Sequence, residues 1–500
     1  MKPAMAFGAL ALSTVTVLAT AGPAAAAAGD GSDRFRRQPV VWAACADPRL
    51  AATGTECATL KVPLDYGDPY GRTLDLAISR LKSTDPAKRR GILLTNPGGP
   101  GGRGLDMPAA VRAQMTPDVA AAYDVVGMDP RGVGASEGLD CGLDRGSWLR
   151  SVGADQQGFE ESWRLAKKDA DACQDTYPDL LPYLTTRNTA RDADVVRSVL
   201  GERRASWFGQ SAGSLLAAAY AQVFPGRVDR LVLDSVPDPA RYGIRMFQDM
   251  GPANERALDD FAAWAAPRHG EYGLGATPAA VRATVEGLVR RAEAAPIRVD
   301  GRQLDGYVLP FLLAVCQSDD RDSVDYASVL RQLLDAADGK PVAVTPVLHD
   351  LLTAVLDARG TGADRDLAAT IGILCDDVAM PRGADWYRDA VARSRAAQPV
   401  FGPVYNGPTP CAFWKHAPRE EPVAVDNSVP ALLVQSTGDT HTPYDGALGM
   451  HAKLRASRLL TVPGRVHTVY LNGYSPCARA AVNAYLLTGA LSATDGTCGS

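Results

Sequence analysis

Hydrophobic positions between residues 60 and 240 fall into short runs separated by stretches of helical periodicity. Leu74, Leu76 and Ile78 stand at alternate positions, as expected of a strand that buries one face. The runs that predict strands are 74–78, 91–95, 123–128, 204–209 and 230–234. The helical stretches between them include 189–200 and 214–223. Strands and helices that alternate in this way predict an α/β protein with a parallel sheet covered by helices.

The pattern changes between residues 241 and 425, where helical stretches follow one another with few strand signals. These stretches are 254–266, 278–294, 323–337 and 367–374. Strand patterns return at 431–435 and 458–462. The sequence therefore predicts a core that begins with 40–240, is interrupted by a mainly helical cap at 241–425, and is completed by 426–500.

Residues 1–28 have the pattern of a secretory signal peptide. Lys2 is followed by an alanine-rich apolar stretch, and the small residues at 24–28 offer a cleavage site. A permanent membrane anchor is the alternative, because the apolar stretch nearly reaches the length that spans a bilayer. Thr16 and Pro23 interrupt the stretch and favour cleavage near Ala28. We therefore expect a secreted protein without membrane contact after signal cleavage.

Composition narrows the class of protein. The chain has 500 residues, of which 46% are hydrophobic and 22% charged, so it is globular rather than disordered. Its length suits a large core that carries an insertion. The formal net charge of -5 and the lack of long basic runs give no reason to expect nucleic acid as a partner.

All nine cysteines follow the predicted signal peptide, and none belongs to a CxxC pair. That spacing argues against a zinc ribbon or a thioredoxin-like redox site, and export favours disulfides. Sequence does not determine connectivity, but closing a short loop costs the least chain entropy. The expected bridges are Cys45–Cys57, Cys141–Cys173, Cys375–Cys411 and Cys477–Cys498. Cys316 is left as a buried free thiol after the apolar run at 309–315.

Residues 209–213 read G-x-S-x-G between a predicted strand and a predicted helix. Such a pattern often occurs by chance, but in the strand–turn–helix context it is typical of a nucleophile elbow. Ser211 would then stand on a sharp turn, and Gly209 and Gly213 would let the strand and helix approach closely. The sequence thus predicts an α/β-hydrolase fold with Ser211 as its nucleophile.

A serine hydroxyl is a poor nucleophile, so a base must take its proton and a carboxylate must orient that base. In α/β-hydrolases the groups follow in the order serine, acid, histidine. Asp439 follows the strand at 431–435, and His467 follows the strand at 458–462. Parallel strands deliver such loops to one edge of the sheet, so Asp439 and His467 are predicted to form a triad with Ser211.

Other histidines and acids fit the triad less well. Three of the six histidines precede Asp439 and fall in the predicted cap. His441 is expected to face solvent or the cleft rim, and His451 to lie on the surface of a helix at 446–454. The alternative acids are Asp376, Asp377 and Asp445.

The glycine-rich segment 96–104 follows the strand at 91–95. A developing oxyanion needs backbone N–H donors that no side chain obstructs, and a glycine loop beside the elbow supplies them. We assign the two donors to Gly99 and to Ala212, the residue after the nucleophile. A phosphate-binding loop does not fit, because the G-x-x-x-x-G-K-[ST] pattern is missing. Neither HExxH nor a zinc-spaced Cys/His cluster occurs, so no metal is expected.

Several motifs in one order resemble a known family. They are NPGGPGG at 96–102, GMDPRGVGASEG at 127–138, GQSAGS at 209–214 and GDTHTP at 438–443. With the late Cys477 and Cys498, they resemble the secreted tripeptidyl aminopeptidases of streptomycetes, which belong with the prolyl-iminopeptidase-like serine peptidases. The resemblance extends roughly over residues 40–500. It implies a capped α/β-hydrolase without cofactor that releases short peptides from free peptide N-termini.

The resemblance also implies roles for single residues. By position it assigns the triad to Ser211, Asp439 and His467, and the oxyanion loop to Gly99. It further implies that Glu255, in the predicted cap, receives the ammonium group of the substrate.

Three departures from the family pattern flank the predicted reacting centre. The family usually has tyrosine where this chain has Ala212, and often serine where it has Arg103. It often has glycine after the histidine, where this chain has Thr468. Ala212 should open space beside the nucleophile, and Arg103 adds a cation that suits an acidic group or carboxylate of the substrate. These departures keep the mechanism but leave open an ester or a non-peptide amide as substrate. A non-catalytic binding protein on a hydrolase scaffold is the third alternative.

Overall fold

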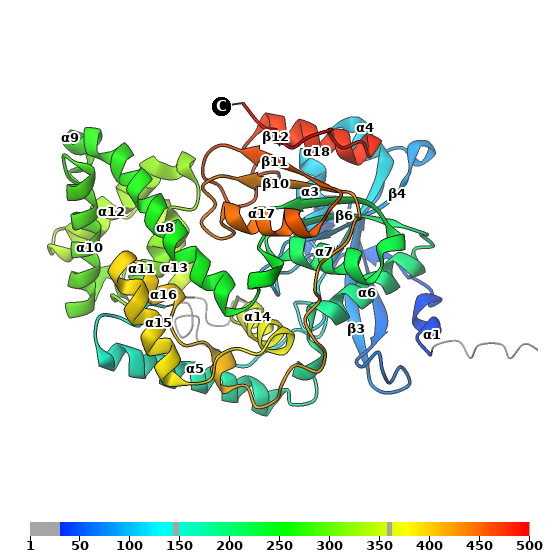
Figure 1. Cartoon of the computed structure of the whole chain (residues 1–500), viewed down its shortest axis with the longest axis horizontal. Helices are drawn as coiled ribbons and strands as arrows, with labels where there is room; N and C mark the ends of the chain where they lie inside the picture. Colours follow the sequence, from blue (N-terminus) through cyan, green and yellow to red (C-terminus); the bar gives the residue numbers. More distant parts are fainter. Residues whose placement is uncertain (1–30, 144–149, 358–362, 500) are drawn as a thin grey trace, which may run out of the picture.

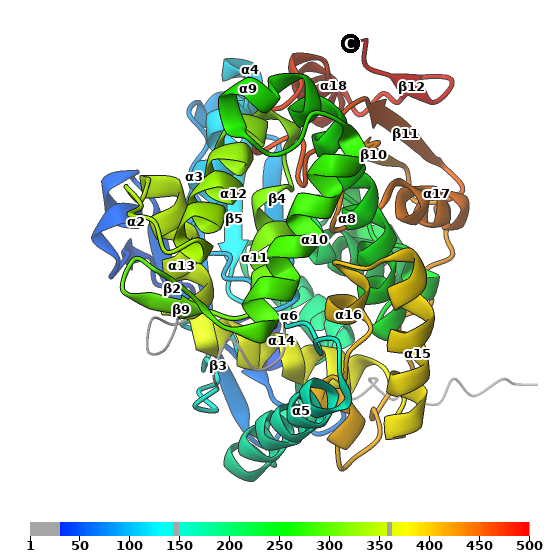
Figure 2. The ribbon, with the colours of Figure 1, turned by 90° about the vertical axis from the view of Figure 1, so that its left-hand side faces the viewer.

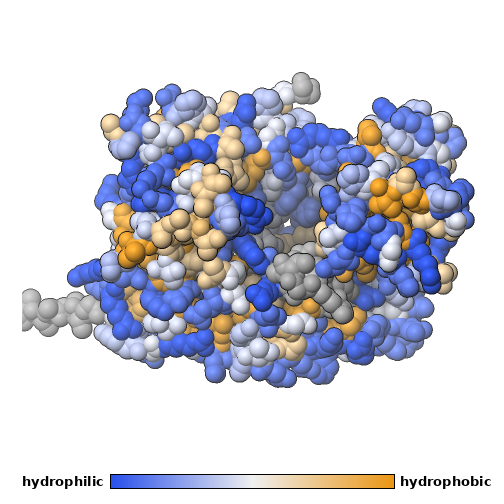
Figure 3. Space-filling model, turned by 180° about the vertical axis from the view of Figure 1, so that it is seen from behind, coloured by the Kyte–Doolittle hydropathy of each residue, from blue (hydrophilic) through white to orange (hydrophobic). Residues whose placement is uncertain are grey.

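The computed structural model of the chain describes residues 31–143, 150–357 and 363–499. The predicted signal peptide at 1–28 lies outside the described residues. Within these ranges a ten-stranded sheet is covered by helices on both faces (Figure 1). A mainly helical region lies beside the sheet, and Figure 2 views the molecule from that side. Seen from behind, the surface is hollowed between the two regions (Figure 3).

The sheet is mostly parallel, in the order β1-β2-β3-β5-β4-β6-β7-β10-β11-β12. Neighbouring strands are parallel from β5 to β12, and β1 to β3 add an antiparallel edge next to β5. The strands are β1 Ala43–Ala44, β2 Glu56–Pro63, β3 Thr73–Leu81, β4 Gly91–Asn96, β5 Tyr123–Met128, β6 Ala205–Gln210, β7 Val228–Asp234, β10 Ala431–Ser436, β11 Ser457–Val462 and β12 Gly496–Thr497. This arrangement confirms the predicted α/β fold class. Each predicted strand coincides with an observed one, whereas β1, β2 and β12, at the two ends of the sheet, were not predicted.

Both faces of the sheet are buried, as the apolar runs require. In β4, Ile92 and Leu94 join the hydrophobic core on one face, and Leu93 joins the core on the other. The helices that cover the first face include α6 Thr186–Val199, α7 Ala212–Val223 and α17 Tyr444–Lys453. The other face is covered by α3 Met107–Gln114, α4 Pro117–Ala122 and α18 Pro476–Thr488. None of the helices in the described ranges is both long and apolar enough to cross a membrane.

The helical region has a hydrophobic core of its own, formed by residues between Leu258 and Tyr405. Its main helices are α8 Ile244–Ala265, α10 Pro278–Ala294, α11 Leu309–Cys316, α12 Ser323–Ala337, α13 Pro346–Leu356 and α16 Gly402–Tyr405. Residues of α14 Ala363–Asp377 and α15 Ala384–Ala397 join the core beneath the sheet instead. The division at 241 and 425 therefore stays a prediction.

The remaining α-helices and strands are short, except for one helix of 21 residues. They are α1 Asp33–Arg36, α2 Pro48–Ala52, α5 Gln156–Thr176, α9 His269–Tyr272 and the hairpin of β8 Ile297–Val299 and β9 Arg302–Leu304.

All four predicted disulfides are present. They join Cys45 to Cys57, Cys141 to Cys173, Cys375 to Cys411 and Cys477 to Cys498. Cys316 is free and buried, as predicted, and burial raises the pKa of its thiol to about 12. The thiol therefore stays protonated at neutral pH and is a poor nucleophile.

Candidate active site

Ser211 lies at the junction of β6 and α7, where the chain turns sharply. Its backbone angles, φ 54° and ψ -133°, lie in a region that non-glycine residues rarely adopt. A Cβ added to Gly209 would lie 2.2 Å from the carbonyl oxygen of Gly213, and one added to Gly213 would lie 2.4 Å from that of Asn96. The two glycines of the motif are therefore required by the close approach of β6, α7 and the 96–102 loop.

His467 and Asp439 form a close pair on the loops that follow β11 and β10. Nδ1 of His467 lies 3.1 Å from Oδ1 and 3.0 Å from Oδ2 of Asp439. The Asp439 side chain is fully buried, whereas that of His467 is 20% exposed. With the Nδ1 proton directed at Asp439, Nε2 of His467 is left as an acceptor, which is the tautomer that a general base needs.

Electrostatics favour a charged Asp439 beside a His467 that binds its proton more tightly than usual. Burial alone would raise the pKa of Asp439, but the charge and hydrogen bond of His467 outweigh it and lower that pKa to about 2. Burial alone would lower the pKa of His467, but Asp439, helped by Asp234, raises it above its ordinary value. The pair is therefore arranged to stabilise an imidazolium.

Asp234, at the end of β7, connects the elbow to the histidine loop. Its backbone oxygen accepts a hydrogen bond from the N–H of Ser211 at 2.9 Å. Its carboxylate accepts from the N–H groups of Val469 (3.0 Å) and the residue after it (2.8 Å). Burial raises the pKa of Asp234 to about 6, although these N–H groups oppose the shift. Sequence reasoning missed this residue, which holds both loops to one strand end.

The 96–102 loop lies directly against the elbow. A Cβ added to Gly98 would lie 2.8 Å from the backbone nitrogen of Ala212. The N–H of Gly98 donates to Oδ1 of Asn96 at 3.0 Å. Within the described residues, the N–H groups of Gly99 and Ala212 have no protein acceptor. Both are therefore available to an incoming oxygen atom, which keeps them as the candidate oxyanion donors.

Replacing Gly98 by alanine is expected to lower kcat about a hundredfold to a thousandfold, the loss typical of a removed oxyanion donor. The new Cβ would clash with the elbow, and the residue has φ +96°, so the loop would have to move. Steady-state kinetics measures the effect. Gly201→Ala is the matched control, because Gly201 has φ +74° but nothing within 4 Å of an added Cβ. Equal activity of both variants would contradict the placement of the loop.

Comparison with known proteins agrees with this geometry. Residues 91–301 match a family model described as alpha/beta hydrolase fold, and residues 398–498 match one described as TAP-like protein. The chain is 33% identical over 481 residues to the tripeptidyl aminopeptidase of Streptomyces coelicolor, with 93% of this chain and 87% of that protein covered. The chain belongs to the tripeptidyl aminopeptidase family of α/β-hydrolases.

Two further relatives widen the range of named activities. Serine protease Hip1 of Mycobacterium tuberculosis is 30% identical, with 92% of this chain and 91% of that protein covered. Carboxylesterase B of the same species is 29% identical, with 88% and 86% covered. As a member of the tripeptidyl aminopeptidase family, the protein is a serine hydrolase, and the relatives named tripeptidyl aminopeptidase and serine protease Hip1 support a serine peptidase.

Glu255, the residue that the family resemblance implies as receptor of the substrate ammonium, is engaged in the fold. One carboxylate oxygen accepts the N–H groups of Val400 (2.9 Å) and Phe401 (3.0 Å). The other accepts from Arg282 at 2.5 Å, and the side chain is only 7% exposed. This arrangement joins α8 to α10 and to the turn before α16. The expected role does not fit, because an ammonium would have to displace Arg282.

Arg103 is likewise paired within the protein. Its Nε lies 2.8 Å from Oδ1 of Asp366 on α14, and the side chain is 46% exposed. This ion pair directs the guanidinium toward α14, and a contact between Arg103 and an acidic group of the substrate stays a prediction.

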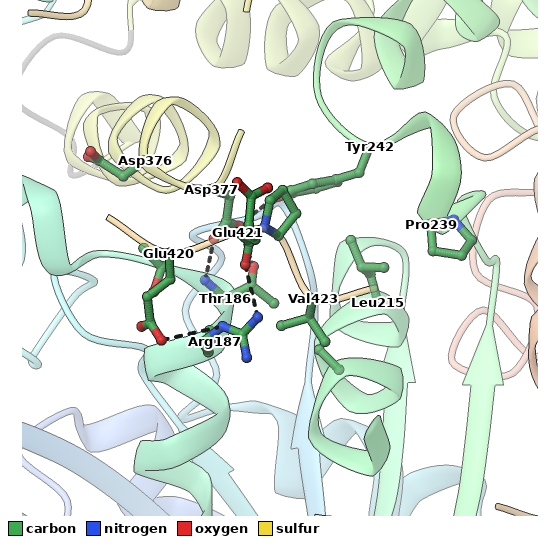
Figure 4. Close-up of a pocket in the computed structure, with 13 residues that line it drawn as sticks. Thr186, Arg187, Leu215, Pro239, Tyr242, Asp376, Asp377, Glu420, Glu421 and Val423 are labelled. Carbon is green, nitrogen blue, oxygen red and sulfur yellow. Dashed lines mark hydrogen bonds and ion pairs between the residues drawn. The ribbon is translucent and has the colours of Figure 1, made fainter. Parts of the chain in front are cut away.

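The alternative acids Asp376 and Asp377 lie at another cavity, of about 40 Å³, between α6, α7 and α14 (Figure 4). Asp377 accepts the N–H of Thr186 at 2.7 Å and the hydroxyl of Tyr242 at 3.0 Å. Asp376 accepts from Trp414 at 3.1 Å and points away from the other labelled side chains. Within the described residues neither carboxylate is hydrogen bonded to His467, so neither replaces Asp439.

His441 lies closer to the candidate site than its sequence position indicates. Its ring stacks on that of His467, with centroids 4.6 Å apart and planes at 26°. The side-chain ligand atoms of Asp439, His441 and His467 lie within 4.8 Å of one another, as a metal site would need. However, both oxygens of Asp439 already accept protein hydrogen bonds. The cluster is therefore better suited to orienting His467 as a base than to binding a metal.

Proposed function

We propose that this protein is an exported aminopeptidase that releases short peptides, most favourably tripeptides, from free N-termini through an acyl-enzyme on Ser211. One observation carries the proposal. Asp234 is hydrogen bonded both to the strained turn at Ser211 and to the loop of His467, which in turn is paired with Asp439. Export is supported by the signal pattern at 1–28 and by four disulfides.

The proposed reaction needs only groups of this chain and water. Oγ of Ser211 attacks the scissile carbonyl carbon while Nε2 of His467 takes its proton. The N–H groups of Gly99 and Ala212 bind the oxygen that becomes negative. His467 then gives the proton to the leaving amine as the C–N bond breaks. Water, deprotonated by His467, releases the peptide and restores Ser211.

The cleft beneath α8 offers a place for a charged N-terminus. A cavity of about 940 Å³ is lined by α8 residues and by the loops after β10 and β11, including Asp439. Asp445 is exposed and lines both this cavity and a neighbouring one of about 320 Å³. It has no ion-pair partner among the residues that the structure describes. We assign the substrate ammonium to Asp445, since a carboxylate forms a charge-assisted hydrogen bond with such a group.

The test compares matched tripeptidyl anilides with free and acetylated N-termini. Acetylation removes the charge, so kcat/KM should fall roughly tenfold to a hundredfold, as expected for a lost hydrogen bond to a charged group. Asp445→Asn should weaken this preference. Equal rates on both substrates would reject the aminopeptidase and favour the second candidate, an esterase, which the relative named Carboxylesterase B supports.

The pH dependence of kcat/KM should reflect the raised pKa of His467. His467 accepts the serine proton only when it is neutral, so activity is absent well below its pKa and appears as pH rises through it. Because Asp439 raises the pKa of His467, the acid limb of kcat/KM should have its midpoint above about 6.5, the ordinary value. A midpoint well below that value would contradict the assigned pair.

A further inference from the structure

His441 contacts both Asp439 and His467, the first through its backbone N–H and the second through its ring. Its backbone N–H donates to Oδ1 of Asp439 at 2.8 Å. Its ring lies nearly parallel to that of His467, with centroids 4.6 Å apart. The N–H contact is available to any residue except proline at this position, but the stacked ring is specific to an aromatic side chain.

The surroundings keep the His441 ring uncharged. Burial and the nearby charge of His467 lower its pKa to about 4. The charged groups that face it across the 320 Å³ cavity come from the loop after β7, from α8 and from α17, and they are Asp238, Arg241, Asp249, Arg256 and Asp445. Near neutral pH, His467 therefore has a neutral aromatic face on one side and the Asp439 carboxylate at Nδ1.

We propose that His441 is a positioning residue whose neutral ring holds the His467 imidazole in plane and stabilises the imidazolium that forms when Ser211 gives up its proton. The inference rests on the proposed function and deepens it. A cation is attracted to the face of an aromatic ring, and the attraction grows when both are shielded from water. The ring also prevents His467 from turning away from Asp439.

The structure offers variants that separate the ring from the backbone N–H. His441→Phe keeps a neutral aromatic face, His441→Leu keeps bulk without one, and His441→Ala removes both. All three keep the N–H that holds Asp439. The measurements are kcat and KM on a tripeptidyl anilide, and the second-order rate of Ser211 phosphonylation by a fluorophosphonate, with melting temperature as a check on folding.

We expect His441→Phe to stay within about threefold of the unmodified enzyme, and the Ala and Leu variants to lose about tenfold in kcat and in phosphonylation, the scale of a shielded cation–aromatic contact. KM should change little, because the residue acts through His467. Full activity of the Ala variant would overturn the inference, as would equal rates for Leu and Phe. Failure of the unmodified protein to react with the probe would instead overturn the proposed function.

Discussion

Replacing Ser211 by alanine is expected to lower kcat by about a millionfold, the loss typical of a removed serine nucleophile. The strained angles at this position are as accessible to alanine as to serine, and the N–H that donates to Asp234 is kept. The variant should therefore remain folded, with an unchanged melting temperature, while steady-state assays and fluorophosphonate labelling both fall to background.

Ser214→Ala is the matched control for this variant. Ser214 lies three residues further on, in the first turn of α7, and its hydroxyl donates to the backbone oxygen of Ser211 at 2.6 Å. It belongs to the same turn but has no part in the proposed chemistry, so its loss of activity should stay within about tenfold, the cost of one local hydrogen bond. A Ser211→Ala protein that keeps a tenth of the activity would show that the nucleophile lies elsewhere.

Asp439→Asn is expected to lower kcat about ten-thousandfold, because an amide favours the wrong tautomer of the histidine. The substitution also removes the charge that raises the pKa of His467, so any remaining activity should have its acid limb at lower pH. Stopped assays over a range of pH measure both effects.

The control for Asp439 is Asp320→Asn. Asp320 also lines the cleft and also accepts a backbone N–H, that of Arg465 at 2.8 Å, but it does not contact His467. Its replacement should leave the acid limb in place. If Asp439→Asn keeps both the rate and the acid limb, another carboxylate orients the base, and Asp234 is the first candidate, because it is already held against the histidine loop.

The sequence was informative where local chemistry determines structure. The central strands were predicted because both faces of the sheet are buried and give short apolar runs, and Ser211 was predicted because the elbow needs glycines on either side. Asp439 and His467 followed from strand order, since parallel strands deliver loops to one edge. The disulfides were predicted correctly because each joins cysteines close in sequence.

The failures come from contacts between distant segments. The sequence predicted substrate contacts for Glu255 and Arg103, and it gave no sign that Arg282 and Asp366 form ion pairs with them in the fold. The ring of His441 stacks on that of His467, which lies 26 residues further along the chain, and no hydrophobic periodicity in the sequence predicts such a contact. Asp234 had a detectable signal, because an acid at the carboxyl end of a predicted strand lies at the edge where ligands bind.

The central claim is that Ser211 carries the acyl group of the substrate during turnover, and the mass of the acyl-enzyme tests it most directly. A tripeptidyl ester with a free N-terminus is mixed with the enzyme and quenched in acid, which protonates His467 and stops deacylation. The protein should gain the mass of the tripeptide acyl group, and peptide mapping should place the added mass on Ser211. An adduct on another residue, or turnover without any adduct in Ser211, would contradict the account.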